Sequence, residues 1–181
     1  METIYNFDFA VLDGIQNIFG CGFLDFLMPL ISLIGGGYLW AVAGLALLFI
    51  KKQRINGITI LSALIVTVLI TEFLIKPIFM RERPFIQNDD FFLLVKEPFG
   101  SSFPSAHTST SFASSVPFFR INRKIGISAV IFAFLVAFSR LYLYVHFPTD
   151  VITGALIGIV FGFLSVIVAD KIRTRKAVNE I

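Results

Sequence analysis

The sequence predicts an all-α, polytopic membrane helical bundle with five to six transmembrane helices and an N-terminal interfacial helix. Three observations support this fold class: 56% of the 181 residues are hydrophobic, only 15% are charged, and the mean hydropathy is +0.85. Soluble domains usually carry about 25% charged residues. The length suits one domain, so we expect residues 1–181 to form a single membrane-embedded unit.

The first element expected is an amphipathic helix over residues 5–19, where apolar side chains alternate with acids and amides. Such a helix lies on the membrane surface. The next stretch, 23–50, is longer than the roughly 20 residues that one span needs, and three glycines at 35–37 interrupt it. It could form one kinked span or two helices.

Three further apolar stretches follow. Residues 58–75 have the length of one span, and residues 125–169, broken near His146 and Pro148, have the length of two. Residues 103–119 are short and rich in Ser and Thr, so we expect them to pack closely against other helices and away from lipid.

The distribution of charge predicts the orientation. Ten of the fifteen Lys and Arg residues lie in three loops that the predicted spans place on one side of the membrane: 51, 52, 54, 120, 123, 124, 171, 173, 175 and 176. The positive-inside rule makes that side cytoplasmic. The other five face the extracytoplasmic side: Lys76, Arg81, Arg83, Lys96 and Arg140. Charges placed against the rule are functional candidates.

Three segments, 76–84, 103–109 and 139–150, meet at this outer face. They carry the cations Lys76, Arg83 and Arg140, which together indicate a bound anion, since guanidinium groups match phosphate oxygens. With Pro104 in the first turn of the third predicted span, backbone N–H groups near Ser105 and Ala106 would point at the same anion.

The same segments contain both histidines of the chain. Phosphoryl transfer needs a nucleophile and an acid for the leaving oxygen. The nucleophile is expected to be His146, because Asp150, four residues later, can fix the imidazole tautomer and leave the other nitrogen free to attack. His107 is then the general acid.

These segments resemble the signature of the type 2 phosphatidic acid phosphatase superfamily, whose fold and site are shared with vanadium haloperoxidases. The family pattern is Lys, six residues, Arg-Pro; then Pro-Ser-x-His; then Ser-Arg, five residues, His, three residues, Asp. Every fixed position of this pattern matches: Lys76, Arg83-Pro84, Pro104-Ser105-Ala106-His107, Ser139-Arg140, His146 and Asp150. The one departure is Ala106, where Gly is usual.

The resemblance implies a phosphatase domain whose catalytic motifs span residues 76–150. In it, Lys76, Arg83 and Arg140 hold the phosphate, and Ser105 hydrogen-bonds it. His107 is the acid, His146 forms a phosphohistidine and Asp150 orients His146. The resemblance implies no metal and no other cofactor.

The function predicted is hydrolysis of a lipid phosphate or diphosphate, with undecaprenyl diphosphate as the best guess. Phosphatidylglycerophosphate or phosphatidate phosphatase activity is the alternative within this class. Halide oxidation with vanadate and a non-catalytic lipid-binding or transport role are alternatives of other classes. Expected partners are the lipid substrate and membrane lipids, without nucleic acid. The expected location is the cell membrane, with the site on the extracytoplasmic face; the oligomeric state and the role of the 85–103 loop stay open.

Several residues outside the pattern carry their own expectations. Arg81 is either a solvated loop charge or a contact to the catalytic groups or to a diphosphate, and Lys96 is a solvated loop residue. Lys76 can pair with Glu72, four residues earlier. Tyr142 and Tyr144 are expected to anchor at the membrane interface. The lone cysteine is expected to be a buried thiol without a metal: Cys21.

Overall fold

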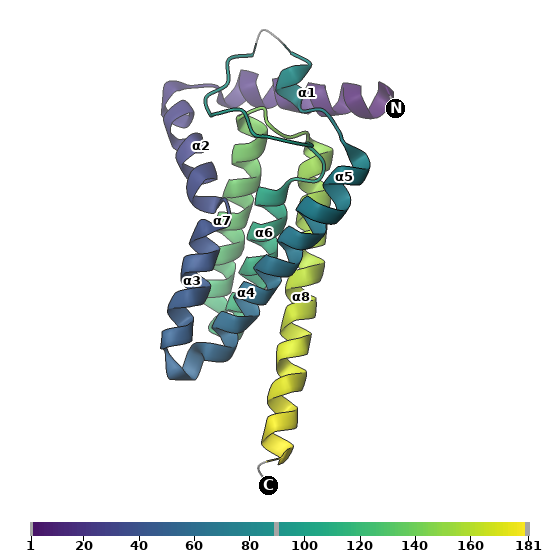
Figure 1. Cartoon of the computed structure of the whole chain (residues 1–181). Helices are drawn as coiled ribbons and strands as arrows, with labels where there is room; N and C mark the ends of the chain where they lie inside the picture. Colours follow the sequence, from purple (N-terminus) through teal and green to yellow (C-terminus); the bar gives the residue numbers. More distant parts are fainter. Residues whose placement is uncertain (1, 89–90, 180–181) are drawn as a thin grey trace.

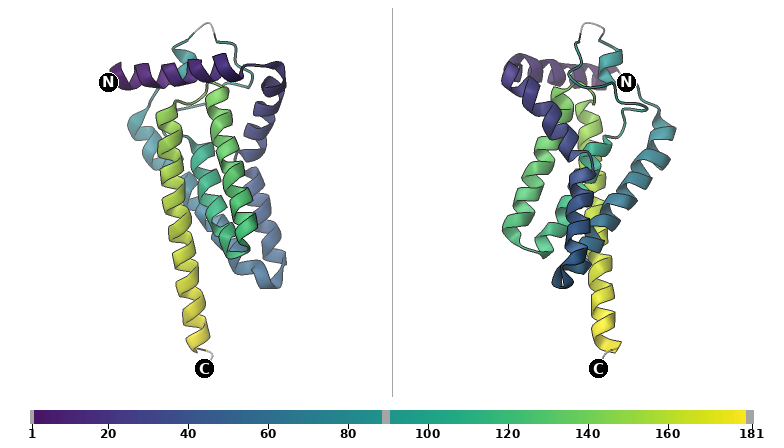
Figure 2. Two further views of the ribbon diagram at one scale, coloured as in Figure 1. Left: turned by 180° about the vertical axis from the view of Figure 1, so that it is seen from behind. Right: turned by 60° about the vertical axis from the view of Figure 1, so that its left-hand side comes forward.

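The computed structural model describes residues 2–88 and 91–179, and in this part of the chain it is all-helical and has no strand. The helices run side by side, with α1 (Glu2–Phe19) lying across one end of the bundle (Figure 1). The end that carries α1 is called the α1 end below, and the end to which the C-terminal part of α8 projects is called the opposite end (Figure 2). The predicted all-α membrane bundle with an N-terminal surface helix is thus confirmed.

The remaining helices alternate in direction. From the α1 end, α2 (Gly22–Gly35) and α3 (Tyr38–Phe49) descend, and a short 3₁₀ turn, η1 (Lys51–Gln53), leads into α4 (Arg54–Val68). The chain returns through a π-helical stretch, η2 (Leu69–Ile75), and α5 (Lys76–Phe79). Beyond the turn η3 (Pro84–Ile86) come α6 (Ala106–Ser115) with its extension η4 (Val116–Arg120), then α7 (Arg123–Tyr142) and α8 (Pro148–Asn179).

Among the described residues, three helical segments are long and apolar enough to cross a membrane: Lys51–Ile86, Arg123–Tyr142 and Pro148–Arg175. The pair α2 and α3 makes a fourth span if it is counted as one, and it is bent by 44°. The stretch 23–50, expected to be one kinked span or two helices, therefore forms two helices, α2 and α3, joined at a bend. Gly37 adopts φ 100° at the bend, a backbone conformation that glycine reaches without steric cost. The count of five to six spans stays a prediction.

Helix α6 occupies the interior of the bundle, packed against α4, α7 and α8. Its residues from Thr108 to Ser115 are buried, which confirms that this short stretch is sheltered. Three glycines of α8 make the approach possible, since a Cβ there would lie 2.3–2.8 Å from backbone carbonyl oxygens of 105, 109 and 113: Gly154, Gly158 and Gly162. The helix begins at Ala106, so the prediction that Pro104 lies in its first turn is wrong; Pro104 lies before Ser105, the N-cap.

Two tyrosines predicted to sit at the membrane interface are instead buried inside the protein. Tyr142 is 0% exposed and its hydroxyl donates to Asp25 Oδ1 (2.6 Å), while Tyr144 is 1% exposed and donates to Asp13 Oδ1 (2.8 Å). They are buried because other segments of the chain pack over them, which the local sequence pattern does not indicate. Helix α1 packs over the loop between α7 and α8, and Phe91 stacks on the Tyr144 ring at 4.3 Å.

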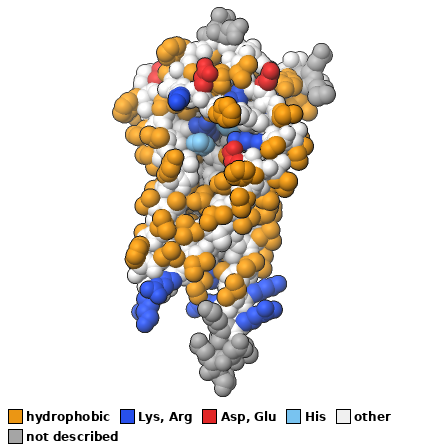
Figure 3. All heavy atoms as spheres, in the orientation of Figure 1, with side chains coloured by type: hydrophobic (Ala, Val, Ile, Leu, Met, Phe, Trp, Pro, Cys, Tyr) orange, Lys and Arg blue, Asp and Glu red, His pale blue; other side chains and the backbone are white. Residues whose placement is uncertain are grey.

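The two ends of the bundle differ in charge. Exposed Lys and Arg side chains gather at the opposite end, as Figure 3 shows, and the loops at 51–54, 120–124 and 171–175 supply them. The side chain of Lys176, also predicted for this group, lies outside the described residues. Cys21, expected to be buried, is exposed at the turn between α1 and α2, because that turn projects at the surface.

Candidate active site

The three motif segments meet at the α1 end. Lys76 begins α5, Arg83 precedes η3, and His107 is the second residue of α6. Arg140 lies in the last turn of α7, His146 in the following loop and Asp150 in the first turn of α8. Figure 3 shows a histidine side chain in a hollow of the surface with Lys and Arg side chains around it. The predicted convergence is therefore present in the structure.

The two ring nitrogens of His146 have different neighbours. Its Nδ1 lies 3.6 Å from Asp150 Oδ2 and 3.5 Å from Ser102 Oγ. Its Nε2 lies 3.3 Å from Arg83 Nη1. A carboxylate at Nδ1 favours the tautomer with hydrogen on that nitrogen, so the lone pair on Nε2 points toward Arg83. Nε2 is consequently the nitrogen that can attack an anion held by Arg83.

His146 is also held neutral. It is 2% exposed, and burial, together with the guanidinium groups of Arg83 and Arg140, keeps the pKa of His146 well below its usual range. A neutral imidazole has a free lone pair, whereas an imidazolium has none. The surroundings of His146 therefore favour the nucleophilic form at neutral pH.

The two motif arginines are buried but carry no counter-charge. Arg83 is fixed by backbone carbonyls, with Nε donating to Gly100 (3.1 Å) and Nη1 to Val145 (2.9 Å). Arg140 donates through Nη1 to Ser32 Oγ, and its Nε has no partner among the described residues. Within the described part of the chain, neither guanidinium forms an ion pair with a carboxylate. Arg83 Nη2 also donates to the Phe99 and Ser101 carbonyls (both 3.3 Å), so its hydrogens are satisfied while its charge is not neutralised. Two buried cations without a carboxylate partner favour the binding of an anion.

Lys76 has a carboxylate partner. Its Nζ lies 2.6 Å from Glu72 Oε1, which confirms the predicted pairing one helical turn apart. Lys76 and Arg83 line the same cavity, of about 450 Å³, with Gly100 and Ser101 on its wall. Lys76 therefore adds a second cation beside Arg83, held in place by Glu72.

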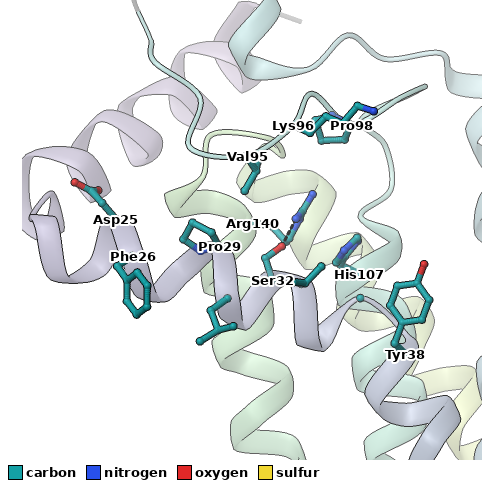
Figure 4. A pocket seen from close by; sticks show the side chains of 13 residues that line it. Asp25, Phe26, Pro29, Ser32, Tyr38, Val95, Lys96, Pro98, His107 and Arg140 are labelled. Carbon is teal, nitrogen blue, oxygen red and sulfur yellow. Dashed lines mark hydrogen bonds between the residues drawn. The ribbon is translucent and has the colours of Figure 1, made fainter.

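His107 and Arg140 line a larger cavity of about 730 Å³ between α2 and the loop after residue 94 (Figure 4). The side toward α2 is mainly apolar, formed by Phe26, Pro29, Leu30 and Leu33, and it also includes Asp25 and Ser32. Gly36 lies against the imidazole, since a Cβ there would be 2.8 Å from His107 Nε2. The cavity thus brings His107, predicted as the acid, and Arg140, predicted to bind phosphate, beside apolar side chains of α2.

The N-terminus of α6 faces the cavity that His107 lines, but its backbone N–H groups are not used as predicted. The Ser105 N–H donates to the Asp150 carbonyl (3.1 Å), so it is not directed at an anion. The N–H groups of Ala106 and His107 are in the first turn, where a helix offers no carbonyl partner. The Ser105 hydroxyl accepts from Thr108 Oγ1 (3.0 Å), which leaves its own hydrogen to donate.

Sequence reasoning missed three residues of this neighbourhood. Ser102 donates to Asp150 Oδ2, and Asp8 pairs with Arg81 Nη2 at 2.6 Å. Ser32 supports Arg140. A signal existed for Asp8, because it lies one helical turn before Leu12 and so shares the buried face of α1. No pattern in the sequence marks Ser32 or Ser102.

The predictions for Lys96 and Arg81, both outside the motifs, have different outcomes in the structure. Lys96 is exposed, as predicted for a loop residue, but it also lines the larger cavity with His107 and Arg140. Arg81 has a side chain only 14% exposed and pairs with two carboxylates, so the solvated-loop alternative is wrong. Its Nη1 atom donates to Asp150, which confirms the alternative of a contact to a catalytic group, and Arg81 also lines the cavity of Lys76 and Arg83, so the diphosphate contact stays a prediction.

Comparisons with known proteins give the family. The family model of the PAP2 superfamily matches residues 56–173. An undecaprenyl-diphosphatase of Sulfolobus acidocaldarius is 34% identical over 79% of this chain and 69% of its own length. The undecaprenyl-diphosphatase BcrC of Bacillus subtilis is 36% identical over 68% of this chain and 61% of its own.

Among solved structures, the PAP2 type phosphatidylglycerolphosphate phosphatase of Bacillus subtilis superposes with a TM-score of 0.79 and 27% identity, covering 95% of this chain and 89% of that one. The matched family region contains every residue of the predicted motifs. The chain therefore belongs to the PAP2 superfamily and is a phosphoric ester hydrolase of the membrane.

Proposed function

We propose that the protein hydrolyses a lipid diphosphate, with undecaprenyl diphosphate as the preferred substrate, through a phosphohistidine on His146 and without a metal. The observation that carries this proposal is a pair of buried arginines that have no carboxylate partner among the described residues: Arg83, 3.3 Å from His146, and Arg140, which lines one cavity with His107. No group of three or more His, Cys, Asp and Glu that could hold a metal occurs in the described residues. The positive charge that a metal would supply comes from Lys76, Arg83 and Arg140.

In the first step, His146 Nε2 attacks phosphorus, and its lone pair forms the N–P bond. The bond between phosphorus and the leaving oxygen breaks, and His107 gives that oxygen its proton. Negative charge on the bound phosphate favours protonation of His107 before this step. Arg83, Arg140 and Lys76 stabilise the charge on the phosphoryl oxygens as the transition state forms.

In the second step, water attacks the phosphohistidine. His107, now neutral, takes a proton from that water, and the N–P bond breaks to return its electrons to His146 Nε2. Inorganic phosphate leaves, and His107 is protonated again for the next cycle. Asp150 stabilises the charge on the His146 ring while the phosphoryl group is attached.

The larger cavity supports a lipid as leaving group. It extends from His107 along the mainly apolar side of α2, which suits a hydrocarbon chain. Lys96 lines the cavity on the side of the loop after residue 94. We infer that Lys96, an exposed side chain on this cavity, can turn to contact the second phosphate of a diphosphate, which remains on the lipid after hydrolysis. Two relatives named undecaprenyl-diphosphatase support this choice. Phosphatidylglycerophosphate and phosphatidate are the alternative substrates.

The test is release of inorganic phosphate in EDTA from undecaprenyl diphosphate, phosphatidylglycerophosphate and phosphatidate. We expect full activity in EDTA and the highest kcat/KM with the diphosphate. Lys96→Ala is expected to lower kcat/KM for the diphosphate by about tenfold and to leave the monoesters unchanged, because one charge-assisted contact is lost. Activity that disappears in EDTA and returns with magnesium or zinc would contradict the metal-free mechanism. A preference for a monoester would redirect the substrate assignment.

We also propose that the site opens on the extracytoplasmic face, because the basic loops lie at the opposite end of the bundle. In a Cys21→Ser background, single cysteines can be placed at two exposed, uncharged positions, Gln87 at the α1 end and Thr174 near the end of α8. In intact cells, an impermeant maleimide should label position 87 and spare position 174 until the membrane is permeabilised. The reverse pattern would place the site in the cytoplasm.

A further inference from the structure

Asp150 reaches His146 with only one of its two carboxylate oxygens. Oδ2 faces the imidazole and accepts from the Phe147 N–H at 2.9 Å. Oδ1 points the other way and accepts from Arg81 Nη1 at 2.6 Å. Ser102 Oγ also donates to Oδ2, so the carboxylate is held by neutral donors at Oδ2 and by the cation Arg81 at Oδ1.

Arg81 is itself held by the N-terminal helix. Its Nη2 lies 2.6 Å from Asp8 Oδ2, and Asp8, on α1, is 0% exposed. Asp8 also accepts from the backbone N–H (3.1 Å) and the hydroxyl (2.7 Å) of Thr149, the residue before Asp150. The guanidinium lies over the Phe147 ring, 4.0 Å from its centroid. Two buried carboxylates thus share one planar cation, and the guanidinium fork donates to each of them through a separate nitrogen.

We propose that Arg81 and Asp8 are positioning residues for the hydrolytic reaction, so that α1 holds the carboxylate that orients His146. This inference rests on the proposed function, because it assigns the pair a role in the nucleophilic attack of His146. The chain of contacts runs from Asp8 through Arg81 to Asp150 and then to the imidazole. Arg81 also lines the cavity of Lys76 and Arg83, but its Nη1 and Nη2 atoms donate to Thr149, Asp150 and Asp8, so we expect the pair to act on kcat through Asp150.

Kinetics of two conservative variants test the proposal, Arg81→Lys and Asp8→Asn. Each is expected to lower kcat between about 10- and 100-fold, the usual cost of losing a group that orients a functional residue, and to change KM by less than about twofold. If both residues act through one chain of contacts, the double variant should be no slower than the slower single variant. The matched control is Asp13→Asn, on the same helix, whose carboxylate binds Tyr144 and not Arg81.

The outcomes separate the alternatives. A raised KM with unchanged kcat would mean that Arg81 contacts substrate, and unchanged kinetics would mean that the pair is only structural; either overturns the proposal. An equal loss in Asp13→Asn, or losses that multiply in the double variant, would also overturn it. If Arg81→Lys does not accumulate, Asp8→Asn carries the test, since it keeps the side-chain shape and an acceptor for the Thr149 N–H. The proposed function is judged separately, by turnover of the wild type and its loss in His146→Ala.

Discussion

The His146→Ala variant is expected to lose at least about 1,000-fold in turnover of the lipid substrate while the protein still inserts into the membrane. The physical reason is that alanine lacks the Nε2 lone pair that forms the N–P bond. Arg83 and Arg140 would still bind the phosphate, so the affinity for a phosphate analogue should change little. Phosphate release by detergent-solubilised protein measures the loss.

The control for this variant is His146→Gln, which keeps a polar side chain of similar reach but cannot form a phosphohistidine. Both variants should elute as folded protein in size-exclusion chromatography, because the imidazole contributes only weak contacts at 3.3–3.6 Å. A variant that keeps more than about one tenth of wild-type turnover would rule out His146 as the nucleophile.

The second large effect is expected for His107→Ala, with a size that depends on the leaving group. A general acid contributes roughly 100- to 10,000-fold when the leaving oxygen needs a proton. The lipid substrate needs one, so its turnover should fall within this range. p-Nitrophenyl phosphate releases a weakly basic phenolate, so formation of its phosphohistidine should be much less affected.

Pre-steady-state kinetics separate the two steps in His107→Ala. With p-nitrophenyl phosphate, a burst of nitrophenolate should be followed by slow turnover, because the variant lacks the base that activates water in the second step. Equal losses with both substrates, and no burst, would show that His107 acts by holding the site together and not by proton transfer.

Much of the site was predictable because its residues belong to three motifs with fixed spacing. The end of the bundle at which they meet also followed from sequence, since basic loops and span lengths order the helices. The start of α6 was misplaced, because Ser105 as N-cap, and not Pro104, sets the first turn. The burial of Asp8 on α1 had a local signal, but its pairing with Arg81 was not predictable, since the two are 73 residues apart and nothing local links them.

The environment of the two tyrosines shows the same limit. Tyr142 and Tyr144 follow an apolar span, which is typical of membrane-interface anchors. Their burial depends on Asp25, Asp13 and Phe91, residues from three other segments that fold over the end of α7. A local sequence pattern can identify a motif, but the segments that bury its residues are set by tertiary packing.

The central claim is a covalent phosphoryl group on His146, and trapping it is the most direct test. Purified protein would be mixed with substrate labelled in the terminal phosphate, quenched in alkali, which preserves phosphohistidine, and digested for mass spectrometry. The account predicts that the added phosphoryl mass lies on His146 in the wild type and that the same peptide is unmodified in His146→Ala. Label on His107, or pre-steady-state turnover without any phosphoenzyme, would contradict it.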